Sequence, residues 1–511
     1  MRGILIVATL AASLWSASAS ETQCPSQCVC SPNSRAKGRL LPGRALCHTM
    51  PRELPLFITT LKVHNSQVPS ITRDSLSRVM GQLDEVILES LHIESVEDGA
   101  FQTATNLRIL KLSSNKLKDI TAGTFTNCTK ITELHLEEND LDFIDDYAFV
   151  SLVNLEELYL QRNQLTHLPS HLPLNLIKLV LATNKIGPDF INNLNLTHLT
   201  TLDLCDNPLG RVSLDALASL GSLQHLCLEG KGLGLPESTA SHIPLLSHLS
   251  LASTTSARLD GATRQELAQL TAITFIQLSN YNILTFKFLE KLTKITEIHL
   301  TTVTISDESG KEFVDSFSQL TTLAIIKLDR SPQLAEVFTQ NAHKFQLRFL
   351  HTLSLRDDGL TILRPGDIPS PNRLTLDVSG NPFHCDCHIE WLQDAHDLQD
   401  QTGTLCVTPV ELHGRSLNTF TPGKLNCPAD DQDASSSGHY SEHDAEDTNT
   451  HIIVICVIAA LIIAVIVLAA AYFLYKKRRC IRISPETELY DQQQQVQTVQ
   501  QMHSNDHLLK K

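Results

Sequence analysis

A leucine pattern returns along this chain at nearly constant spacing, and few folds accommodate it. The pattern LxxLxLxxNxL occurs in five successive copies, separated by 24, 24, 21 and 23 residues. A period of this length, with one short strand and one return segment per copy, is typical of a solenoid of stacked coils. The copies are LRILKLSSNKL (107–117), ITELHLEENDL (131–141), LEELYLQRNQL (155–165), LIKLVLATNKI (176–186) and LTTLDLCDNPL (199–209).

The alternation of leucines within each copy predicts the fold class. In an extended strand inward leucines alternate with outward side chains, so each coil buries one face and must stack on its neighbours. We predict an α/β solenoid, a horseshoe with a parallel sheet on its concave side. Phe101, Phe125 and Phe149, each 24 residues after the last, are expected to stack in the convex half of the core. Asparagines where the strands turn are expected to satisfy backbone groups; they are Asn115, Asn139, Asn163, Asn184 and Asn207.

The pattern continues beyond residue 223 but becomes weaker. Some intervals lengthen to 27 and 28 residues, and the asparagine returns only at Asn381. Two less regular coils around Leu61 and Val86 bring the total to about fourteen repeats over residues 53–380. We therefore predict a regular first half and a looser second half, with a change of curvature near 230–360. The residues that replace the asparagine are Lys231, Thr254, Tyr281, Val303, Ser331 and Asp358.

Cysteines gather at both ends of the repeats. CPSQCVC (24–30) with Cys47 belongs to an N-terminal cap at 20–52, and NPFHCDCHIEWL (381–392) with Cys406 and Cys427 to a C-terminal cap at 381–427. The stretch HCDCH resembles a metal site, but structural zinc sites usually space their cysteines by two to four residues. In a secreted protein such cysteines indicate disulfides. We therefore predict two caps and no metal or other cofactor.

Two apolar segments predict the cellular location. Residues 1–19 have the charge, apolar core and small-residue cleavage site of a secretory signal. Residues 452–475 are apolar, uncharged and long enough to cross a bilayer, and five basic residues follow at 476–482. These features predict a single-pass type I protein of the plasma membrane, with an acidic disordered stalk at 428–451 and a short glutamine-rich cytoplasmic tail at 476–511. Cys480, just inside the membrane, is a candidate for palmitoylation.

The repeats together with the CPxxCxC and NPFxCDCxxxWL caps resemble the extracellular leucine-rich repeat receptors of animals. That family includes Toll-type ectodomains, variable lymphocyte receptors, and slit-like and synaptic proteins. The resemblance covers residues 24–427 and implies four disulfides, Cys24–Cys30, Cys28–Cys47, Cys385–Cys406 and Cys387–Cys427. The chain differs from Toll-type receptors because its tail is too short for a folded signalling domain.

A second group of cysteines lies within the repeats, beside two histidines. Counted from the first leucine of each repeat, His225 and His248 occupy position 3, Cys227 position 5 and Cys205 position 7. Strand spacing and a two-residue offset place Cys205 and Cys227 about 8 Å apart at Cα, beyond the usual disulfide limit of about 7 Å. The spacing thus favours two free thiols, while a disulfide closed by twist and a metal site with the histidines remain alternatives.

Positions 3, 5 and 7 of the early repeats form the predicted ligand surface. Carboxylates outnumber bases there, and Tyr159 lies among them as a rigid amphipathic contact. A solvated face is the alternative, but a large open sheet with this composition favours binding of a basic protein. The candidate residues are Glu85, Glu89, Glu133, His135, Glu137, Glu138, Glu157, Tyr159, Gln161 and Arg162.

Two glycosylation sequons fall on the return segments, Asn127-Cys128-Thr129 and Asn195-Leu196-Thr197. Sugars there would leave the concave face open. The formal net charge of −15 makes nucleic acid an improbable ligand.

The sequence contains no GxSxG, HExxH or phosphate-binding glycine motif, so we do not expect an enzyme. We expect a recognition or adhesion receptor for an extracellular protein or glycoprotein, working through a membrane co-receptor. The alternatives are an auxiliary subunit of a channel or another membrane protein, and a membrane-tethered matrix-binding protein.

Overall fold

The structure is a computed structural model, and it describes residues 23–32, 43–187, 194–210, 219–231, 233–235, 237–369, 374–393, 397–398, 404–420 and 425. The predicted signal, stalk, membrane span and tail, with Cys480, lie outside these residues. Among the described residues, no helix is both long enough and apolar enough to span a membrane.

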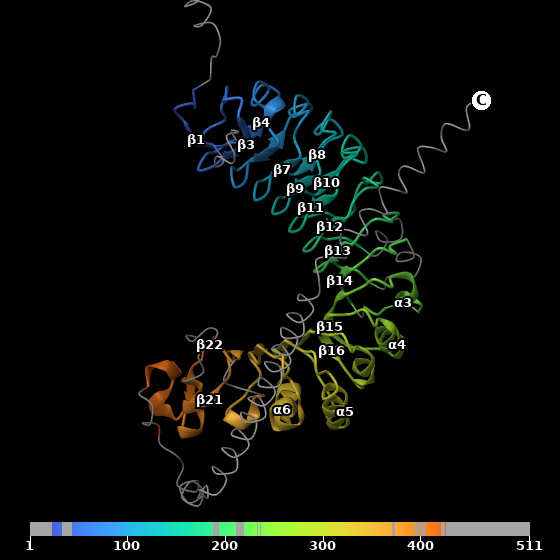
Figure 1. Cartoon of the computed structure of the whole chain (residues 1–511), viewed down its shortest axis with the longest axis vertical. Coiled ribbons are helices and arrows are strands. Elements are labelled where there is room, and N and C mark those ends of the chain that lie inside the picture. Colours follow the sequence, from blue (N-terminus) through green and yellow to red (C-terminus); the bar gives the residue numbers. More distant parts are fainter. Residues whose placement is uncertain are drawn as a thin grey trace, which may run out of the picture. The chain divides into compact units, whose positions relative to one another are not determined.

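A ladder of parallel strands carries the repeats, with one strand for each coil (Figure 1). An antiparallel pair, β1 (Cys28–Pro32) and β2 (Gly43–Cys47), begins it, and β22 (Asp397–Leu398) ends it. The strands between them are β3 (Ile58–Val63), β5 (Glu85–Ile87), β7 (Ile109–Lys111), β9 (Glu133–His135), β11 (Glu157–Tyr159), β12 (Lys178–Val180), β13 (Thr201–Leu204), β14 (His225–Gly230), β15 (His248–Arg258), β16 (Phe275–Asn282), β17 (Glu297–Thr301), β18 (Ile325–Lys327), β19 (Thr352–Ser354) and β20 (Thr375–Asp377).

The return segments contain short strand pairs and helices. Three two-strand pairs lie there or in the C-terminal cap: β4 (Ser70–Ile71) with β6 (Ser95–Val96), β8 (Asp119–Ile120) with β10 (Phe143–Ile144), and β21 (Phe383–His384) with β23 (Cys406–Thr408). The α-helices within the described residues are α3 (Thr239–His242), α4 (Gly261–Gln269), α5 (Asp307–Phe317) and α6 (Pro332–Gln340). The 3₁₀ helices are η1 (Met80–Gln82), η3 (Lys287–Lys291), η4 (Ala342–Lys344), η5 (Pro365–Asp367), η7 (Cys387–Gln393), η8 (Val410–Leu412) and η9 (Leu417–Thr419).

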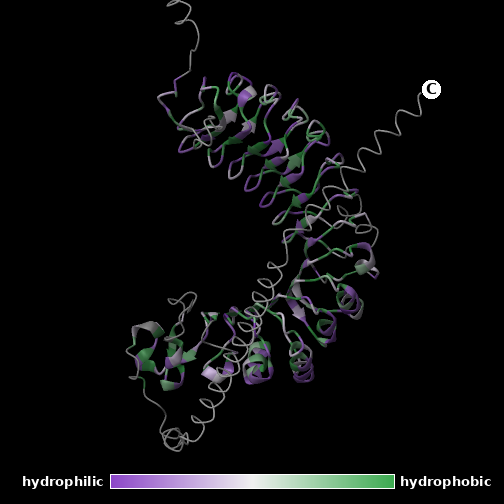
Figure 2. Cartoon of the chain, in the orientation of Figure 1, coloured by the Kyte–Doolittle hydropathy of each residue, from purple (hydrophilic) through white to green (hydrophobic). Residues whose placement is uncertain are grey.

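The core is a stack of aliphatic layers between the strands and the return segments. Leu110, Leu134 and Leu158 pair in register across β7, β9 and β11, and all three are fully buried. The three phenylalanines stack as expected, with 6.2 Å between the ring centroids of Phe101 and Phe125 and of Phe125 and Phe149. Figure 2 shows hydrophobic residues returning in successive coils.

The asparagines form the predicted ladder at the ends of the strands. The Asn139 side chain donates from Nδ2 to the carbonyls of Leu112 and Leu136, both at 3.0 Å, and Oδ1 accepts from the Leu117 N–H at 3.0 Å. Its counterparts at Asn115, Asn163, Asn184 and Asn207 repeat this arrangement and are buried. Each asparagine therefore joins its own coil to the preceding one.

The later repeats differ from the early ones in their return segments. Figure 1 shows that α3–α6 lie in these return segments, on the far side of each coil from its ladder strand. Other side chains take over the role of the asparagine: the Ser331 hydroxyl donates to the Leu300 carbonyl at 3.0 Å and accepts from the Val303 N–H at 2.9 Å. The hydroxyl of the buried Tyr281 donates to the Leu233 carbonyl, also at 3.0 Å. In the later repeats, hydrogen bonds from serine and tyrosine hydroxyls therefore join neighbouring coils in place of the asparagine amide.

Disulfides hold both caps. The structure bonds Cys24 to Cys30, Cys28 to Cys47 and Cys385 to Cys406, the pairs that the family resemblance implies. Cys387 is also disulfide-bonded, and its expected partner Cys427 lies outside the described residues. The cysteines of HCDCH therefore have a structural role in the C-terminal cap.

Candidate binding face

The side of the ladder opposite the return segments carries the predicted ligand residues. We call it the open face, and it consists of the side chains at positions 3, 5 and 7 of each repeat. In β9, Glu133 and His135 point to this face and are partly exposed, while Leu134 between them is fully buried. The alternation of a single strand therefore separates the surface from the core.

His135 lies at the centre of a polar network on the open face. Its Nε2 lies 2.6 Å from Glu133 Oε1, and its Nδ1 lies 3.0 Å from Glu137 Oε1. Burial alone would lower the pKa of His135, but the hydrogen bonds to Glu137 and Glu133 outweigh it and raise the pKa. For Glu133, burial opposes the effects of His135 and Lys111, and the net result is a lowered pKa. The network thus favours an ion pair between imidazolium and carboxylate.

Tyr159 on β11 continues this network onto the next two strands. Its ring stacks on that of His135 with 4.2 Å between centroids and an interplanar angle of 10°. Its hydroxyl donates to Glu157 and accepts from Lys178 Nζ at 2.9 Å, and that Nζ lies 4.8 Å from the Tyr159 ring centroid. Burial, and then the hydrogen bond to Glu157, raise the pKa of Tyr159. The ring is therefore held in place from several sides before any ligand arrives.

The carboxylates of the open face are paired more fully than the sequence indicated. Lys62 Nζ lies 3.4 Å from Glu89, Lys111 Nζ lies 3.5 Å from Glu133, and Arg162 lies 2.8 Å from Glu138. Lys62, Lys111 and Lys178 also belong to this surface, although they were not predicted from the sequence. Their signal was present in the position numbering, since Lys111 occupies position 5 and Lys178 position 3 of their repeats.

Of the remaining predicted residues, Glu85 accepts a hydrogen bond from the Thr60 hydroxyl on β3 at 3.1 Å. Gln161 Oε1 and Glu137 Oε2 are buried and have no hydrogen-bond partner among the described residues.

Cys205 and Cys227 form a disulfide, so the expectation of two free thiols was wrong. Their Cα atoms lie 5.3 Å apart, whereas an extended chain would have placed them about 8 Å apart. The reason is that β13 ends at Leu204. The N–H of Cys205 donates to Asp203 Oδ1 at 3.0 Å, and Asp206 adopts a φ of 54°, so the chain turns at Cys205.

The histidines beside this disulfide form a row of rings rather than a metal site. Ring centroids lie 4.1 Å apart for His225 and His248, 5.8 Å for His248 and Phe275, and 5.0 Å for Phe275 and His299. Among the described residues, the cluster of potential metal ligands contains Asp203, Cys205 and Cys227 and neither His225 nor His248. Since both sulfurs are in the disulfide, this donor set is poorly suited to zinc, which takes thiolates.

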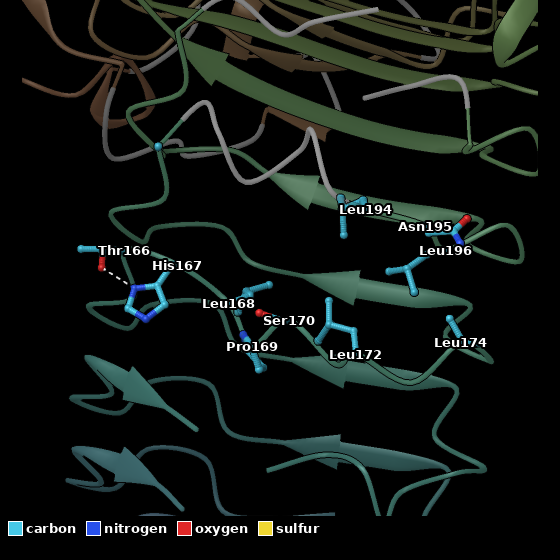
Figure 3. A pocket seen from close by; sticks show the side chains of 11 residues that line it. Thr166, His167, Leu168, Pro169, Ser170, Leu172, Leu174, Leu194, Asn195 and Leu196 are labelled. Carbon is cyan, nitrogen blue, oxygen red and sulfur yellow. Dashed lines mark hydrogen bonds between the residues drawn. The ribbon is translucent and has the colours of Figure 1, made fainter. Parts of the chain in front are cut away.

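The two sequon asparagines lie on the return side. Asn127 and Asn195 are both exposed, and each stands four residues before the first aliphatic residue of its repeat, Ile131 and Leu199. Beside Asn195 is a cavity of about 580 Å³ between two return segments, and five of the eleven residues that line it are leucines (Figure 3). Figure 3 shows Leu168, Leu172, Leu194 and Leu196 around it. Both sequons therefore lie away from the open face.

Comparisons with known proteins agree with this architecture. Models of the leucine-rich repeat match residues 81–141, 129–186 and 198–220. Chondroadherin-like protein of Mus musculus is 39% identical over 75 residues, 14% of this chain and 10% of that protein. Leucine-rich repeat and fibronectin type-III domain-containing protein 4 of Rattus norvegicus is 32% identical over 90 residues, 16% of this chain and 14% of that protein. The chain thus spans a small part of these relatives.

Solved structures are similar at lower identity. A leucine-rich repeat protein of Leptospira interrogans is 20% identical with a TM-score of 0.46, covering 68% of this chain and 92% of that one. TLR13 in its complex with ssRNA13 is 18% identical with a TM-score of 0.42, covering 72% of this chain and 54% of that one. The matched models show that this chain contains leucine-rich repeats, and the structure sets these repeats in a ladder of parallel strands between disulfide-bonded caps.

Proposed function

We propose that this chain is a cell-surface recognition or adhesion receptor that binds an extracellular protein or glycoprotein along the open face. Three features support this function: the disulfide caps, which suit an oxidising compartment, the apolar segment 452–475, and the long exposed sheet. It would act together with a membrane co-receptor. The observation that carries the proposal is the fixed position of Tyr159.

Tyr159 has the properties of a contact that contributes strongly to binding. Binding orders flexible side chains at a cost of about 0.5–1.5 kcal/mol each, so a side chain that is already ordered binds more tightly. The stack on His135 and the hydrogen bonds to Glu157 and Lys178 order Tyr159 in the free protein. On the early strands of the open face, the carboxylates still outnumber the bases that pair with them, and this excess favours a ligand with a basic surface.

The test is a screen of the soluble ectodomain, residues 20–427, against secreted and surface proteins, followed by two substitutions. We expect Tyr159→Ala to weaken binding of the identified ligand by about thirtyfold, equivalent to roughly 2 kcal/mol for a hot spot. Glu137→Lys should weaken binding further by reversing a charge.

Tyr147→Ala is the matched control. Tyr147 also stacks on a histidine, His171, at 4.8 Å between centroids, but it lies on a return segment and is 59% exposed. Binding that survives Tyr159→Ala with Glu137→Lys, or that is lost equally in Tyr147→Ala, would show that the ligand does not use this part of the open face. Replacing residues 452–511 by an unrelated anchor should leave recognition intact.

A further inference from the structure

The part of the open face on β13–β17 differs chemically from the network around Tyr159. Its position-3 side chains are Thr201, His225, His248, Phe275 and Glu297 on successive strands. A row of rings therefore stands between Thr201 at one end and Glu297 at the other, and Asp203 lies beside the Thr201 end, two residues further along β13. We call this group the histidine section: Asp203, His225, His248, Phe275, Glu297 and His299.

A small side chain leaves one ring face of this row uncovered. His248 covers one face of the His225 ring, with 4.1 Å between centroids. On the other side His225 is in register with Thr201 on β13, whose side chain is too short to cover the ring. A depression of about 360 Å³ extends along the row from β13 to β17. Thr201, Asp203 and His225 line it at the β13 end, and Phe275 and Glu297 line it at the other end.

The shape and charge of this depression suit a guanidinium group. Arginine stacks flat on ring faces and pairs with carboxylates, and it is more weakly hydrated than lysine. An arginine on the free face of His225 would have the Asp203 carboxylate beside it. Lys178 on β12 is near enough for its charge to act on His225, but its Nζ is already bonded to the Tyr159 hydroxyl on β11 at 2.9 Å.

We propose that the histidine section is a second contact site on the open face, which takes an arginine side chain of a basic protein ligand at neutral pH and releases it on acidification. This inference rests on the proposed function, since it assigns a further subsite to the same ligand. Protonation of His225 and His248 would place two positive charges against the guanidinium and against each other.

The surroundings of the histidines favour their neutral form, so that protonation of these rings requires more acid than it does for an exposed histidine. Burial, then His248 and Lys178, lower the pKa of His225. Burial also lowers the pKa of His248, against the opposing charge of Glu297. His299 faces Glu297, Lys327 and Asp329, and burial followed by Lys327 lowers its pKa. All three rings are therefore neutral at pH 7.4 and gain charge only in acid.

The experiment measures binding of a labelled hexa-arginine peptide to the full-length protein in detergent, by fluorescence anisotropy at pH 7.4 and pH 5.5. We expect binding to be about tenfold or more weaker at pH 5.5. The double variant His225→Phe with His248→Phe keeps two aromatic rings but has no imidazole there to take up a proton. Phe275, the next ring in the row, shows that a phenylalanine fits beside residue 248. The double variant should bind at pH 7.4 and lose the part of the pH dependence that comes from the histidines. Burial raises the pKa of Asp203, so the part that remains comes from this carboxyl group.

Three controls separate this site from general attraction of a basic peptide to an acidic surface. Asp203→Asn should weaken binding at pH 7.4 by about tenfold, as expected for loss of a charge-assisted pair. His198→Phe changes an exposed histidine just before β13 and should keep the pH dependence of the unchanged protein. Hexa-lysine should bind more weakly than hexa-arginine.

Absence of hexa-arginine binding at pH 7.4, or an unchanged pH dependence in the double phenylalanine variant, would overturn the inference. Equal binding of hexa-lysine would overturn the assignment to arginine. The weaker binding of Asp203→Asn supports the inference when this variant keeps the melting temperature of the unchanged protein, because the loss then comes from the missing charge and not from unfolding. The Tyr159→Ala test is independent of all these outcomes, so the proposed function can stand when this subsite fails.

Discussion

At the scale of single residues, Asp358 is an aspartate in the position of a ladder asparagine. It is 2% exposed, and its Oδ1 accepts from the Ser331 N–H at 2.6 Å. Asparagines in this position also donate, as Asn381 Nδ2 does to the Leu355 carbonyl at 2.6 Å. Asp358 Oδ2 is buried and has no partner among the described residues. An ionised carboxylate cannot supply the missing donor, but a protonated one can.

We predict that Asp358→Asn stabilises the protein, and more strongly as the pH rises. Burial is the main cause that raises the pKa of Asp358, from 3.8 to about 7. The folded state thus binds the proton more tightly than the unfolded state, so stability falls as the pH rises from about 4 through about 7. The asparagine variant lacks this loss. Denaturant unfolding should give a gain of roughly 2–4 kcal/mol at pH 8 and little difference at pH 4.

The reverse substitution elsewhere in the ladder provides the control. Asn139→Asp would bury a carboxylate where two carbonyls now accept from Nδ2. This variant should be less stable than the unchanged protein, with the deficit increasing from pH 4 to pH 8. A gain for Asp358→Asn that does not vary with pH would show that the carboxylate is not the cause.

For single residues, the sequence could predict where a side chain lies in its repeat, but it predicted few of the contacts between side chains of different strands. The ladder asparagines follow from the repeat alone, because every coil presents the same unpaired backbone groups to the same position. The Cys205–Cys227 disulfide did not follow, because it depends on a turn after Leu204 that the hydrogen bond to Asp203 helps to fix. The bases that pair with the acidic residues also escaped prediction, since each pair joins different strands.

At the scale of the elements, the asparagine ladder connects coil to coil, and its loss should be measurable at one joint. Asn163 Nδ2 donates to the carbonyls of Leu136 and Leu160, and Oδ1 accepts from the Leu141 N–H. Asn163→Ala leaves these buried groups unpaired, and we expect a loss of about 2–3 kcal/mol in denaturant unfolding.

Asn154→Ala is the control for this effect. Asn154 lies in the same coil and also reaches the preceding one, donating to the Thr129 carbonyl at 2.7 Å, but it is exposed. Water can replace the lost partner there, so we expect a loss under about 1 kcal/mol. Equal losses in the two variants would mean that burial does not set the strength of the ladder.

The return segments of the later repeats were only partly foreseen from the sequence. The longer intervals indicated a change there, and the structure uses the extra residues for helices such as α5 and α6. A signal for α5 was present, since Ser306 precedes two acidic residues and its hydroxyl accepts from the Ser309 N–H. The prediction rested on the leucine spacing of the strands and did not use helix-start signals. For this reason it did not include α5.

At the scale of the whole ladder, each coil contacts mainly its neighbours, so the two ends are its weakest places. The Cys385–Cys406 and Cys205–Cys227 disulfides close loops of almost equal length, with separations of 21 and 22 residues. Loop length alone would give them nearly the same stabilising effect. Their positions differ, because one closes the cap after β20 and the other lies between paired strands in the middle.

We therefore predict unequal effects when each disulfide is removed by paired Cys→Ser substitution. Without Cys385–Cys406, the cap should open and the amide hydrogens of β19 and β20 should exchange about a hundredfold faster, while those of β9 stay protected. Without Cys205–Cys227, β13 and β14 remain held by four residue pairs in register, and exchange should change less than about tenfold. Equal acceleration in both variants would mean that the ladder unfolds as one cooperative unit. The cap would then contribute cross-linking alone, and the end of the stack would be no weaker than its middle.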